Sequence, residues 1–268
     1  MLIHELRCFG AAPGSGNIAL VIENGPPSPA ERQAFAARQN RSACVFLDAP
    51  QQQEQPYSAD FYYPHARSPL CLHATLAAAG VLLPRGHAAL VTAMRGQKVL
   101  LRQAGGAVFA GVRRQAVAPL GIDPALPSRL LGEPALTLAS PPLLSSVGSA
   151  KLLIEVPDSA TLHALDPPLA RIVEWGKEHG VNGCYVYCRT GENSYEGRNF
   201  NHLDPAREDS ATGVAAGALS AWLGRGLTLL QGHALGNPCR ILTSIDGHDI
   251  FVGGAVDTAG PVLERNTR

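Results

Sequence analysis

The sequence predicts an α+β protein made of two similar domains with a cleft between them. Two Ala/Leu/Gly-rich runs without a charged residue, at 74–83 and 212–224, indicate helices that are apolar on every side and therefore buried. In both halves of the chain, strands and a more polar helix precede such a run, and further strands follow it. This repeated order predicts two units with one plan. A chain of 268 residues is long enough for two domains of ordinary size.

Strand patterns dominate the first half. Pro29 suits the first turn of a helix that we expect over 28–39, and Phe35 lies on the less polar side of that helix. The glutamine-rich stretch at 51–55 is an expected loop. The remaining apolar stretches predict strands at 3–9, 17–22, 43–47, 59–63, 88–93, 98–102 and 107–112.

A stretch from 119 to 142 that carries Pro, Gly and Ser is the expected border between the domains. We therefore place the first domain at 1–120, with residues 257–268 as a candidate completion of it, and the second domain at 121–256. The expected elements of the second half are helices at 168–179 and 212–224, and strands at 151–156, 181–189, 194–201, 239–245 and 249–256.

The composition indicates a globular protein. The 22 basic and 22 acidic residues give a formal net charge of zero, so no strong positive field is present to attract nucleic acid. No apolar run approaches the roughly 20 residues of a membrane-spanning helix. Residues 1–5 resemble the start of a strand and not a signal peptide. Six cysteines without a dense framework indicate reduced thiols. We therefore expect a cytoplasmic protein that binds neither nucleic acid nor a membrane.

Reactive polar residues stand directly before both apolar runs. Cys71 and His73 precede the first run, and Asp209 precedes the second. The first backbone N–H groups of a helix have no partners within the helix, and this end of the helix dipole is positive. Two such helix starts that face one cleft would form an anion site with an ionisable group beside each.

Blocks of residues spread over nearly the whole chain carry a resemblance by their order and spacing. They are Phe9 with Gly16-Asn17-Ile18-Ala19-Leu20-Val21, Asn40-Arg41-Ser42 with Phe46, Tyr63-Pro64 through Cys71-Leu72-His73-Ala74-Thr75-Leu76-Ala77, Arg198-Asn199-Phe200, Glu208-Asp209-Ser210-Ala211-Thr212-Gly213, Gln231-Gly232, Gly236-Asn237-Pro238 and Val252-Gly253-Gly254. At these blocks the chain resembles the PhzF family of phenazine-biosynthesis isomerase-like proteins. That family shares a fold with diaminopimelate epimerase and proline racemase.

The resemblance implies two domains, each a barrel-like, mostly antiparallel sheet wrapped around one central helix. It implies cofactor-independent movement of a proton on a small carboxylate-bearing metabolite, without a metal ion, in a homodimer. His73 and Asp209 would be the catalytic residues, since imidazole titrates near neutrality and suits proton transfer. The groups that would bind the substrate are Ser42 and the backbone amides of Leu72, His73, Gly213 and Val214.

Six positions depart from the family pattern. The catalytic glutamate of the family falls on Ala43, and alanine cannot carry a proton. Positioned acid–base catalysis contributes 10²–10⁴-fold, so the loss of this group should cost roughly 3–5 kcal/mol of barrier lowering. The other five replace a glycine by Leu72, a serine by Val214, a glutamate by Arg67, an arginine by Asn237 and a proline by Ser210.

Several candidate residues keep a second interpretation. Asp209 is either a catalytic carboxylate or the N-terminal cap of the second apolar helix. Cys71 aligns with the catalytic thiol of the racemase and epimerase relatives, but a place in the core is the favoured interpretation, since no second cysteine stands at 210–211. Arg67 is either a solvated loop residue, which we favour, or a group that binds a second substrate acid. The other cysteines expected in the core are Cys44, Cys184 and Cys188.

Three functional hypotheses follow. The leading one is a PhzF-like isomerase that acts on a small amino or hydroxy acid through His73 and Asp209. The second is an amino-acid racemase or epimerase that depends on Cys71 as nucleophile or base. The third, motivated by Ala43 and Val214, is a catalytically impaired member of the family that binds a ligand.

Overall fold

The computed structural model describes residues 1–39, 41–52, 55–200, 208–260 and 263–264. The chain groups into two compact units, one of residues 1–111 with 253–268 and the other of residues 112–252. Each unit contains both helices and strands, which confirms the predicted α+β class. Independent folding of two domains, with the limits at 120/121 and 256/257 that the sequence suggests, stays a prediction.

The first unit contains two long helices and strands from both ends of the chain. Its elements are β1 (Leu2–Cys8), β2 (Asn17–Glu23), α1 (Pro29–Gln39), β3 (Ala43–Asp48), β4 (Tyr57–Tyr62), β5 (Arg67–Ser68), α2 (Leu72–Leu82), the 3-10 helix η1 (Leu83–Arg85), β6 (Ala89–Thr92), β7 (Lys98–Ala104), β8 (Ala107–Arg113), which runs across the border, β17 (Val256–Thr258) and β18 (Leu263–Glu264).

The second unit repeats this order with two additional short helices. Its elements are α3 (Leu126–Leu131), β9 (Leu143–Ser146), β10 (Ala150–Glu155), α4 (Ser159–Ala164), α5 (Leu169–His179), β11 (Cys184–Arg189), β12 (Ser194–Phe200), β13 (Glu208–Asp209), α6 (Gly213–Leu223), β14 (Thr228–Gln231), the 3-10 helix η2 (His233–Leu235), β15 (Cys239–Asp246) and β16 (Asp249–Gly254).

The two units share one pattern of strand pairing. In the first unit, β2–β3 and β4–β6 are parallel, whereas β1–β2, β3–β4, β4–β5 and β6–β7 are antiparallel. In the second unit, β10–β11 and β12–β14 are parallel, whereas β9–β10, β11–β12, β12–β13 and β14–β15 are antiparallel. These pairs correspond one to one and in the same order. The repeated plan that the sequence predicts is therefore present, with mostly antiparallel pairing.

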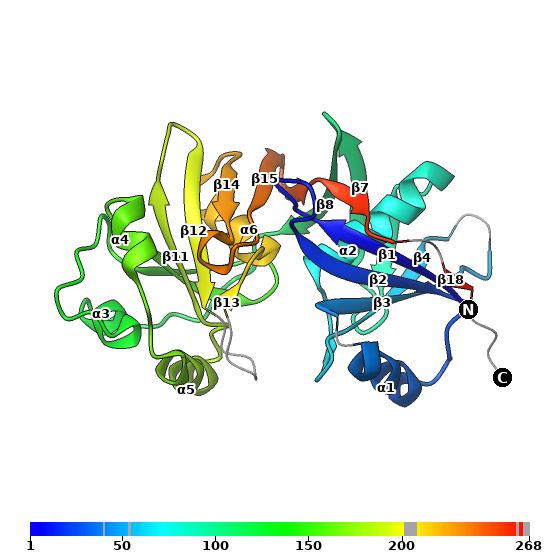
Figure 1. The fold of residues 1–268 in the computed structure, drawn as a ribbon, viewed down its shortest axis with the longest axis horizontal. Helices are drawn as coiled ribbons and strands as arrows, with labels where there is room; N and C mark the ends of the chain where they lie inside the picture. Colours follow the sequence, from blue (N-terminus) through cyan, green and yellow to red (C-terminus); the bar gives the residue numbers. More distant parts are fainter. Residues whose placement is uncertain (40, 53–54, 201–207, 261–262, 265–268) are drawn as a thin grey trace. The chain divides into compact units, whose positions relative to one another are not determined.

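One helix of each unit is buried against several strands (Figure 1). In the first unit, α2 contacts β1, β2, β3, β4 and β17, and Gly80 is the one residue of α2 that is not fully buried. A Cβ atom on Gly80 would lie 2.9 Å from the Val256 side chain, so this position needs a glycine. In the second unit, α6 contacts β9, β10 and β15. Its last turn leaves Trp222 49% exposed, so the predicted burial holds for the first two turns of α6 and not for its end.

Several short elements were missed by the sequence patterns, among them β14 and the two-residue strands β5 and β13. The stretch at 119–142, expected to be irregular, contains α3, and neither β9 nor α4 was expected. Each of these helices has six residues, which is less than two turns, so no apolar period can develop. The other expected elements are present, with ends that differ by one to three residues.

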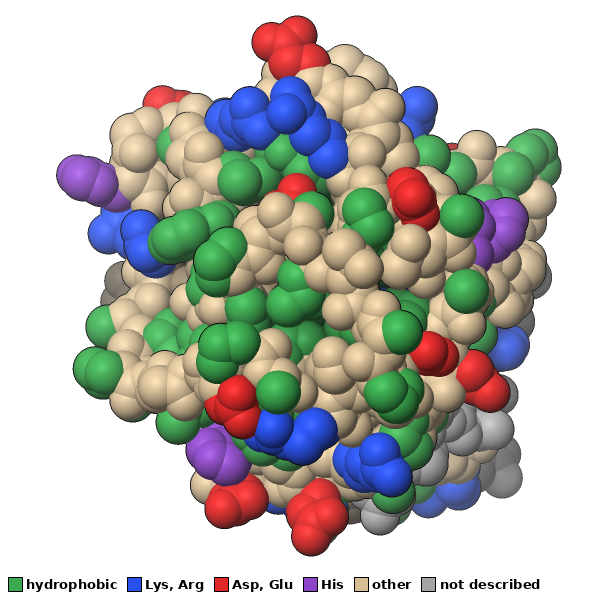
Figure 2. Space-filling view, turned by 90° about the vertical axis from the view of Figure 1, so that its left-hand side faces the viewer, with side chains coloured by type: hydrophobic (Ala, Val, Ile, Leu, Met, Phe, Trp, Pro, Cys, Tyr) green, Lys and Arg blue, Asp and Glu red, His purple; other side chains and the backbone are tan. Residues whose placement is uncertain are grey.

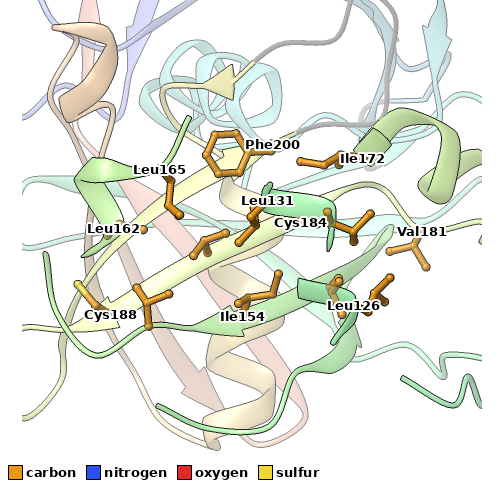
Figure 3. Close-up of a cluster of buried hydrophobic side chains, with 14 residues drawn as sticks. Leu126, Leu131, Ile154, Leu162, Leu165, Ile172, Val181, Cys184, Cys188 and Phe200 are labelled. Atoms are coloured by element: carbon orange, nitrogen blue, oxygen red, sulfur yellow. The ribbon is translucent and has the colours of Figure 1, made fainter. Parts of the chain in front are cut away.

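The second unit has a large hydrophobic core of its own (Figure 3). Cys184 and Cys188 on β11 lie in it together with Ile154 on β10 and Phe200 on β12. Both thiols are fully buried, which confirms that these cysteines belong to the core. In the first unit, Cys44 belongs to a smaller cluster that α1 covers through Phe35.

The distribution of charge on the surface and the length and polarity of the helices agree with the expectations from composition. Figure 2 looks at the molecule from the side of the second unit, and there basic and acidic side chains are interspersed among hydrophobic ones. In the part of the chain that the structure describes, the helices are all too short or too polar to span a membrane.

Candidate functional site

The start of α2 brings a thiol and an imidazole together in the first unit. Cys71 is the N-cap residue of α2, in an extended conformation. Its Sγ atom lies 3.3 Å from Nδ1 of His73 and 3.9 Å from Nε2. Cys71 is 2% exposed and His73 9% exposed, so the pair is shielded from bulk water. Thr75 secures the turn, because both its N–H and its hydroxyl donate to the Cys71 carbonyl at 2.8 Å.

The environment of Cys71 favours the thiolate. Burial alone would raise the pKa of the Cys71 thiol, but the charge of His73 and hydrogen bonds from His73, Tyr63 and the Ala74 N–H outweigh burial and lower this pKa. The Ala74 N–H belongs to the first turn of α2, where amide donors lack helical partners. A thiolate with a low pKa is the reactive form of cysteine. The geometry therefore supports chemistry at Cys71 in addition to a place in the core.

Two further thiols next to this pair have the opposite character. Cys8 on β1 donates through Sγ to the His73 carbonyl at 3.2 Å, and it is completely buried. Burial, reinforced by the Cys71 charge, raises the pKa of the Cys8 thiol well above its usual range. The same two causes raise the pKa of Cys44 to about 12. At neutral pH these two cysteines are neutral packing residues.

The other predicted residues of the first unit differ in exposure. Ser42 is exposed and directly precedes β3, whereas Ala43 is the first residue of β3 and is fully buried. Leu72, the first residue of α2, is 2% exposed, so its side chain is packed within the unit. Asn40 lies outside the described residues. The side chain at position 43, where the family has a glutamate, is a methyl group without a titratable proton.

Asp209 lies at the start of the buried helix of the second unit. Its Oδ2 atom accepts the Thr212 hydroxyl at 2.6 Å, and its Oδ1 atom accepts the Ala211 N–H at 3.4 Å. The N-cap residue of α6 is Thr212, whose side chain makes no capping bond. The interpretation of Asp209 as the N-cap is therefore wrong. Its carboxylate holds the turn that precedes α6, while Gly213 and Val214 form the first residues of the helix.

Gln231 supports this turn from β14, and the sequence reasoning assigned it no role. Its Nε2 donates to the Asp209 carbonyl at 2.6 Å, and its Oε1 accepts the Thr212 N–H at 3.3 Å. Asn237 adds a bond from Nδ2 to the Ser210 hydroxyl at 2.8 Å. Both residues lie in motif blocks of the sequence, and this position was the one indication that they support the site.

A buried lysine lies beside Asp209. Lys151 on β10 is 1% exposed, and its Nζ donates to Oδ1 of Asn199 at 2.8 Å. Asn199 on β12 pairs with Asp209 on β13. Burial lowers the pKa of Lys151 to about 8, and the Asp209 charge opposes this shift. In the described residues the hydroxyl of Tyr185, also fully buried, has no hydrogen-bond partner. Sequence reasoning missed this group because a single lysine on a strand gives no pattern.

Arg198 and Glu208 hold β13 in place. Nε and Nη2 of Arg198 donate to the two carboxylate oxygens of Glu208 at 3.0 and 2.8 Å. Nη1 of Arg198 also donates to the carbonyls of Leu162 and Leu165 at 3.1 and 2.6 Å. Both charged side chains are about nine-tenths buried and fully paired. These two motif residues therefore hold the strand that carries Asp209, and their charges are paired with each other.

Arg67 is exposed, which agrees with the favoured interpretation, but it belongs to the short strand β5 and takes part in an ion-pair network. Its Nε donates to Oδ1 of Asp60 at 2.8 Å, and Asp60 is 3% exposed. Asp60 also accepts Nη1 of Arg32 at 3.2 Å and the Tyr62 hydroxyl at 2.9 Å. This pairing could not be predicted from the sequence, because Asp60 and Arg67 lie on different strands that only the fold brings together.

The predicted residues thus form two sets. The first unit brings together Cys71, Leu72 and His73, and the second brings together Asp209, Gly213 and Val214. Each set combines an ionisable side chain with the first turn of a largely buried helix. Such a turn provides amide donors to an anion, and the side chain beside it can accept or donate a proton.

Comparison with known proteins agrees with this geometry. Residues 6–260 match the PhzC-PhzF family model, described as phenazine biosynthesis-like protein. The chain is 30% identical to an uncharacterized isomerase from Deinococcus radiodurans, over 90% of this chain and 86% of that protein.

Solved structures show the same fold. A protein described as a predicted epimerase from Pseudomonas aeruginosa superposes with a TM-score of 0.79 at 23% identity, covering 100% of this chain and 99% of its own. A hydroxyproline epimerase from Agrobacterium vitis superposes with a TM-score of 0.60 at 14% identity, covering 98% and 91% of the two chains.

Proposed function

The chain belongs to the PhzC-PhzF family of phenazine biosynthesis-like proteins, and on this premise we propose that it is a cofactor-independent isomerase. It moves a proton on a small amino or hydroxy acid. The observation that carries the proposal is the pairing of an ionisable side chain with the first turn of a largely buried helix in each unit. Proton transfer between carbon atoms changes no oxidation state overall, so acid–base side chains are sufficient for it.

Backbone amides are proposed to hold the substrate carboxylate. They are the amides of residues 72–73 at the start of α2 and of 213–214 at the start of α6, with the Ser42 hydroxyl as an additional donor. The Thr212 side chain makes no capping bond at the start of α6, which supports the proposal. An anion at such a position also interacts favourably with the helix dipole.

His73 and Asp209 are proposed to move the proton. His73 contacts a thiol that carries negative charge readily, and Asp209 is held by Thr212 and supported by Gln231. Both groups lie in rigid surroundings, which is what a positioned acid or base requires. With alanine at position 43, the removal and the return of the proton fall to these two groups.

A second candidate function is an amino-acid racemase or epimerase that depends on Cys71. The lowered pKa of the Cys71 thiol and its contact with His73 favour this candidate. In this case the thiolate removes the proton from the carbon next to the carboxylate. The third candidate, a ligand-binding member without turnover, is favoured by the fully buried methyl group of Ala43.

We further propose that the protein acts as a homodimer in the cytoplasm. The six cysteines are all free thiols, which suits a reducing compartment. Light scattering coupled to size-exclusion chromatography tests the dimer, and a monomer mass over the micromolar range would contradict it.

Proton exchange in heavy water tests the proposed function. Purified protein is incubated with a panel of amino and hydroxy acids in D₂O, and deuterium uptake is measured by mass spectrometry and NMR. We expect uptake at one carbon of at least one acid, and a loss of about 10²–10⁴-fold in H73N and in D209N. The variant H179N, which changes an exposed histidine on α5, is the matched control.

The variant C71S separates the two enzymatic candidates. The isomerase proposal expects exchange to persist in C71S, whereas a thiol-dependent racemase loses it. Tight binding of an acid without exchange in the native protein would identify the ligand-binding candidate. An absence of exchange with every acid of the panel would contradict proton-transfer chemistry.

A further inference from the structure

Three potential metal ligands meet in the second unit, away from the groups of the proposed proton transfer. They are His163 in the last turn of α4, Glu196 on β12 and His233 at the start of η2. Nε2 of His163 lies 2.6 Å from Oε1 of Glu196. The two imidazole rings are 4.2 Å apart between centroids, with an angle of 7° between their planes. One donor atom from each residue lies within 4.8 Å of the others.

Two imidazoles and one carboxylate are a donor set that suits a transition-metal ion. Imidazole and carboxylate both bind Zn²⁺ at 2.0–2.2 Å, and three protein ligands with a water molecule complete a tetrahedron. Donor atoms of such a tetrahedron are about 3.3 Å apart. The widest separation, at most 4.8 Å, has to shorten by about 1.5 Å to reach this value, and the 2.6 Å between His163 and Glu196 has to lengthen by about 0.7 Å. Magnesium and calcium prefer oxygen ligands only, so the histidines select against them.

The two histidines can make the required movement. Glu196 is fixed by its strand, and its side chain is 14% exposed, whereas the His163 side chain is 33% exposed and His233 is exposed. The parallel rings cannot both point their nitrogens at one ion, so one ring has to turn. The exposed ring of His233 can turn without displacing a packed neighbour. Ligation by Nε2 of His163 also requires its proton to reside on Nδ1.

We propose that His163, Glu196 and His233 bind one divalent transition-metal ion, with Zn²⁺ as the physiological candidate. The ion fastens three elements that are far apart in the sequence. It replaces the hydrogen bond between His163 and Glu196 by two coordination bonds and uses the carboxylate to offset part of its charge. Because the ligands are more than 30 residues apart along the chain, the site cannot be predicted from a short sequence motif.

Two of the three metal ligands are close in sequence to residues that support the Asp209 turn. His233 follows Gln231 by two residues, and Gln231 donates to the Asp209 carbonyl. His163 follows Leu162, whose carbonyl accepts Arg198, the partner of Glu208. A bound ion therefore stabilises both segments that hold the Asp209 turn. Its role is structural, since none of its ligands is a proposed proton carrier.

Isothermal titration calorimetry of the full-length protein with ZnCl₂, after removal of metal by a chelator, tests the site. We expect one Zn²⁺ per chain, and a weakening of about tenfold or more in H233A and in E196Q. The variant H179A removes an exposed histidine that stacks on Trp175, and it should bind like the native protein. Circular dichroism melting confirms that each variant is folded, and Zn²⁺ should raise the melting temperature of the native protein and not that of H233A.

The spectrum of bound Cu²⁺ provides a second readout. Electron paramagnetic resonance should show nitrogen coupling from two imidazoles in the native protein and from one in H233A. The proposal is overturned if Zn²⁺ does not bind, or if H233A and E196Q bind it as tightly as the native protein. The three residues are then no more than a surface hydrogen bond and a ring stack.

Discussion

The thiol of Cys71 lies 3.3 Å from Nδ1 of His73, within the first turn of a helix that has no exposed face. A thiol and an imidazole, a pair in which the imidazole can activate the thiol, are thereby held in contact in the first unit. The contact follows from the local geometry of a helix start, where an extended N-cap residue and the second helical residue point to the same side. It gives the first prediction.

Replacing His73 by glutamine should raise the pKa of the Cys71 thiol. Burial opposes the thiolate, and the His73 charge is the largest of the effects that overcome it, so burial dominates in H73Q. We expect the first thiolate of the native protein to form below the usual pH range of a thiol, and to form at a higher pH in H73Q. Ultraviolet absorbance of the thiolate during a pH titration measures this. The variant C71S, which should lack that first step, assigns it, and an equal midpoint in H73Q would refute the role of His73.

Introducing a carboxyl group at position 43 should destabilise the protein in a pH-dependent way. Ala43 is fully buried, so the new carboxyl group has a folded-state pKa above its unfolded value of about 4.3. The stability of A43E is then highest below pH 4 and falls as the pH rises towards the folded-state pKa. For a shift of roughly 3 pKa units the loss is about 4 kcal/mol.

The variant A43Q has nearly the same size without the charge and is the matched control. Urea denaturation at pH 4 to 7 should show the free energies of unfolding of A43E and A43Q diverging with rising pH. Parallel curves would mean that the carboxylate at position 43 is solvated or paired, as it is expected to be in an intact catalytic site.

The buried amino group of Lys151 should make the protein more stable at alkaline pH. Its folded-state pKa of about 8 lies below the unfolded value of about 10.4, so the folded state releases this proton first. Below pH 8 the cost of burying the charge is present in full, and it disappears as the pH rises to about 10.4. The gain amounts to about 3 kcal/mol.

The buried thiols have raised pKa values, so they lower the stability of the folded protein in the same pH range. The variant K151M keeps these thiols and therefore separates the contribution of Lys151 from theirs. The difference in unfolding free energy between native protein and K151M should increase in favour of the native protein from pH 7 to 10. A constant difference in urea denaturation over that range would show that Lys151 titrates normally.

Gly232 should tolerate alanine much less well than Gly224 does. Both glycines have a positive φ, of 86° and 66°, which costs a residue with a Cβ atom about 1 kcal/mol. A Cβ atom on Gly232 would in addition collide with the carbonyl oxygen of Asn237 and lie 3.0 Å from that of Ser210, whereas nothing lies within 4 Å of one on Gly224. Urea denaturation should place G232A at least roughly 2 kcal/mol below G224A. Equal stabilities would show that the backbone around Ser210 yields easily.

The long elements of the fold could be predicted because their signals are local. The charge-free runs of α2 and α6 and the alternation of the strands are periodic over many residues, and the repeat of their order predicts two units with one plan. The short helices α3 and α4 contain fewer than two turns, so the same signal is absent. Motif blocks identified the family, and residues 6–260 match its model.

The partners of the candidate site residues could not be predicted in this way. Asp209 accepts the Thr212 hydroxyl, and Arg67 pairs with a buried aspartate. Both outcomes depend on which strands become neighbours and on which polar groups are left to be satisfied when water is removed.

By itself, the sequence determined which segments are buried, that the plan is repeated, and that a thiol, an imidazole and a carboxylate precede two buried helices. The tertiary structure alone decided that His73 lowers the pKa of the Cys71 thiol and that burial lowers the pKa of Lys151. It also decided that His163, Glu196 and His233 lie close together. The physical reason is that burial and periodicity are properties of single segments. A pKa or a ligand set depends on distances between segments that only the folded chain brings together.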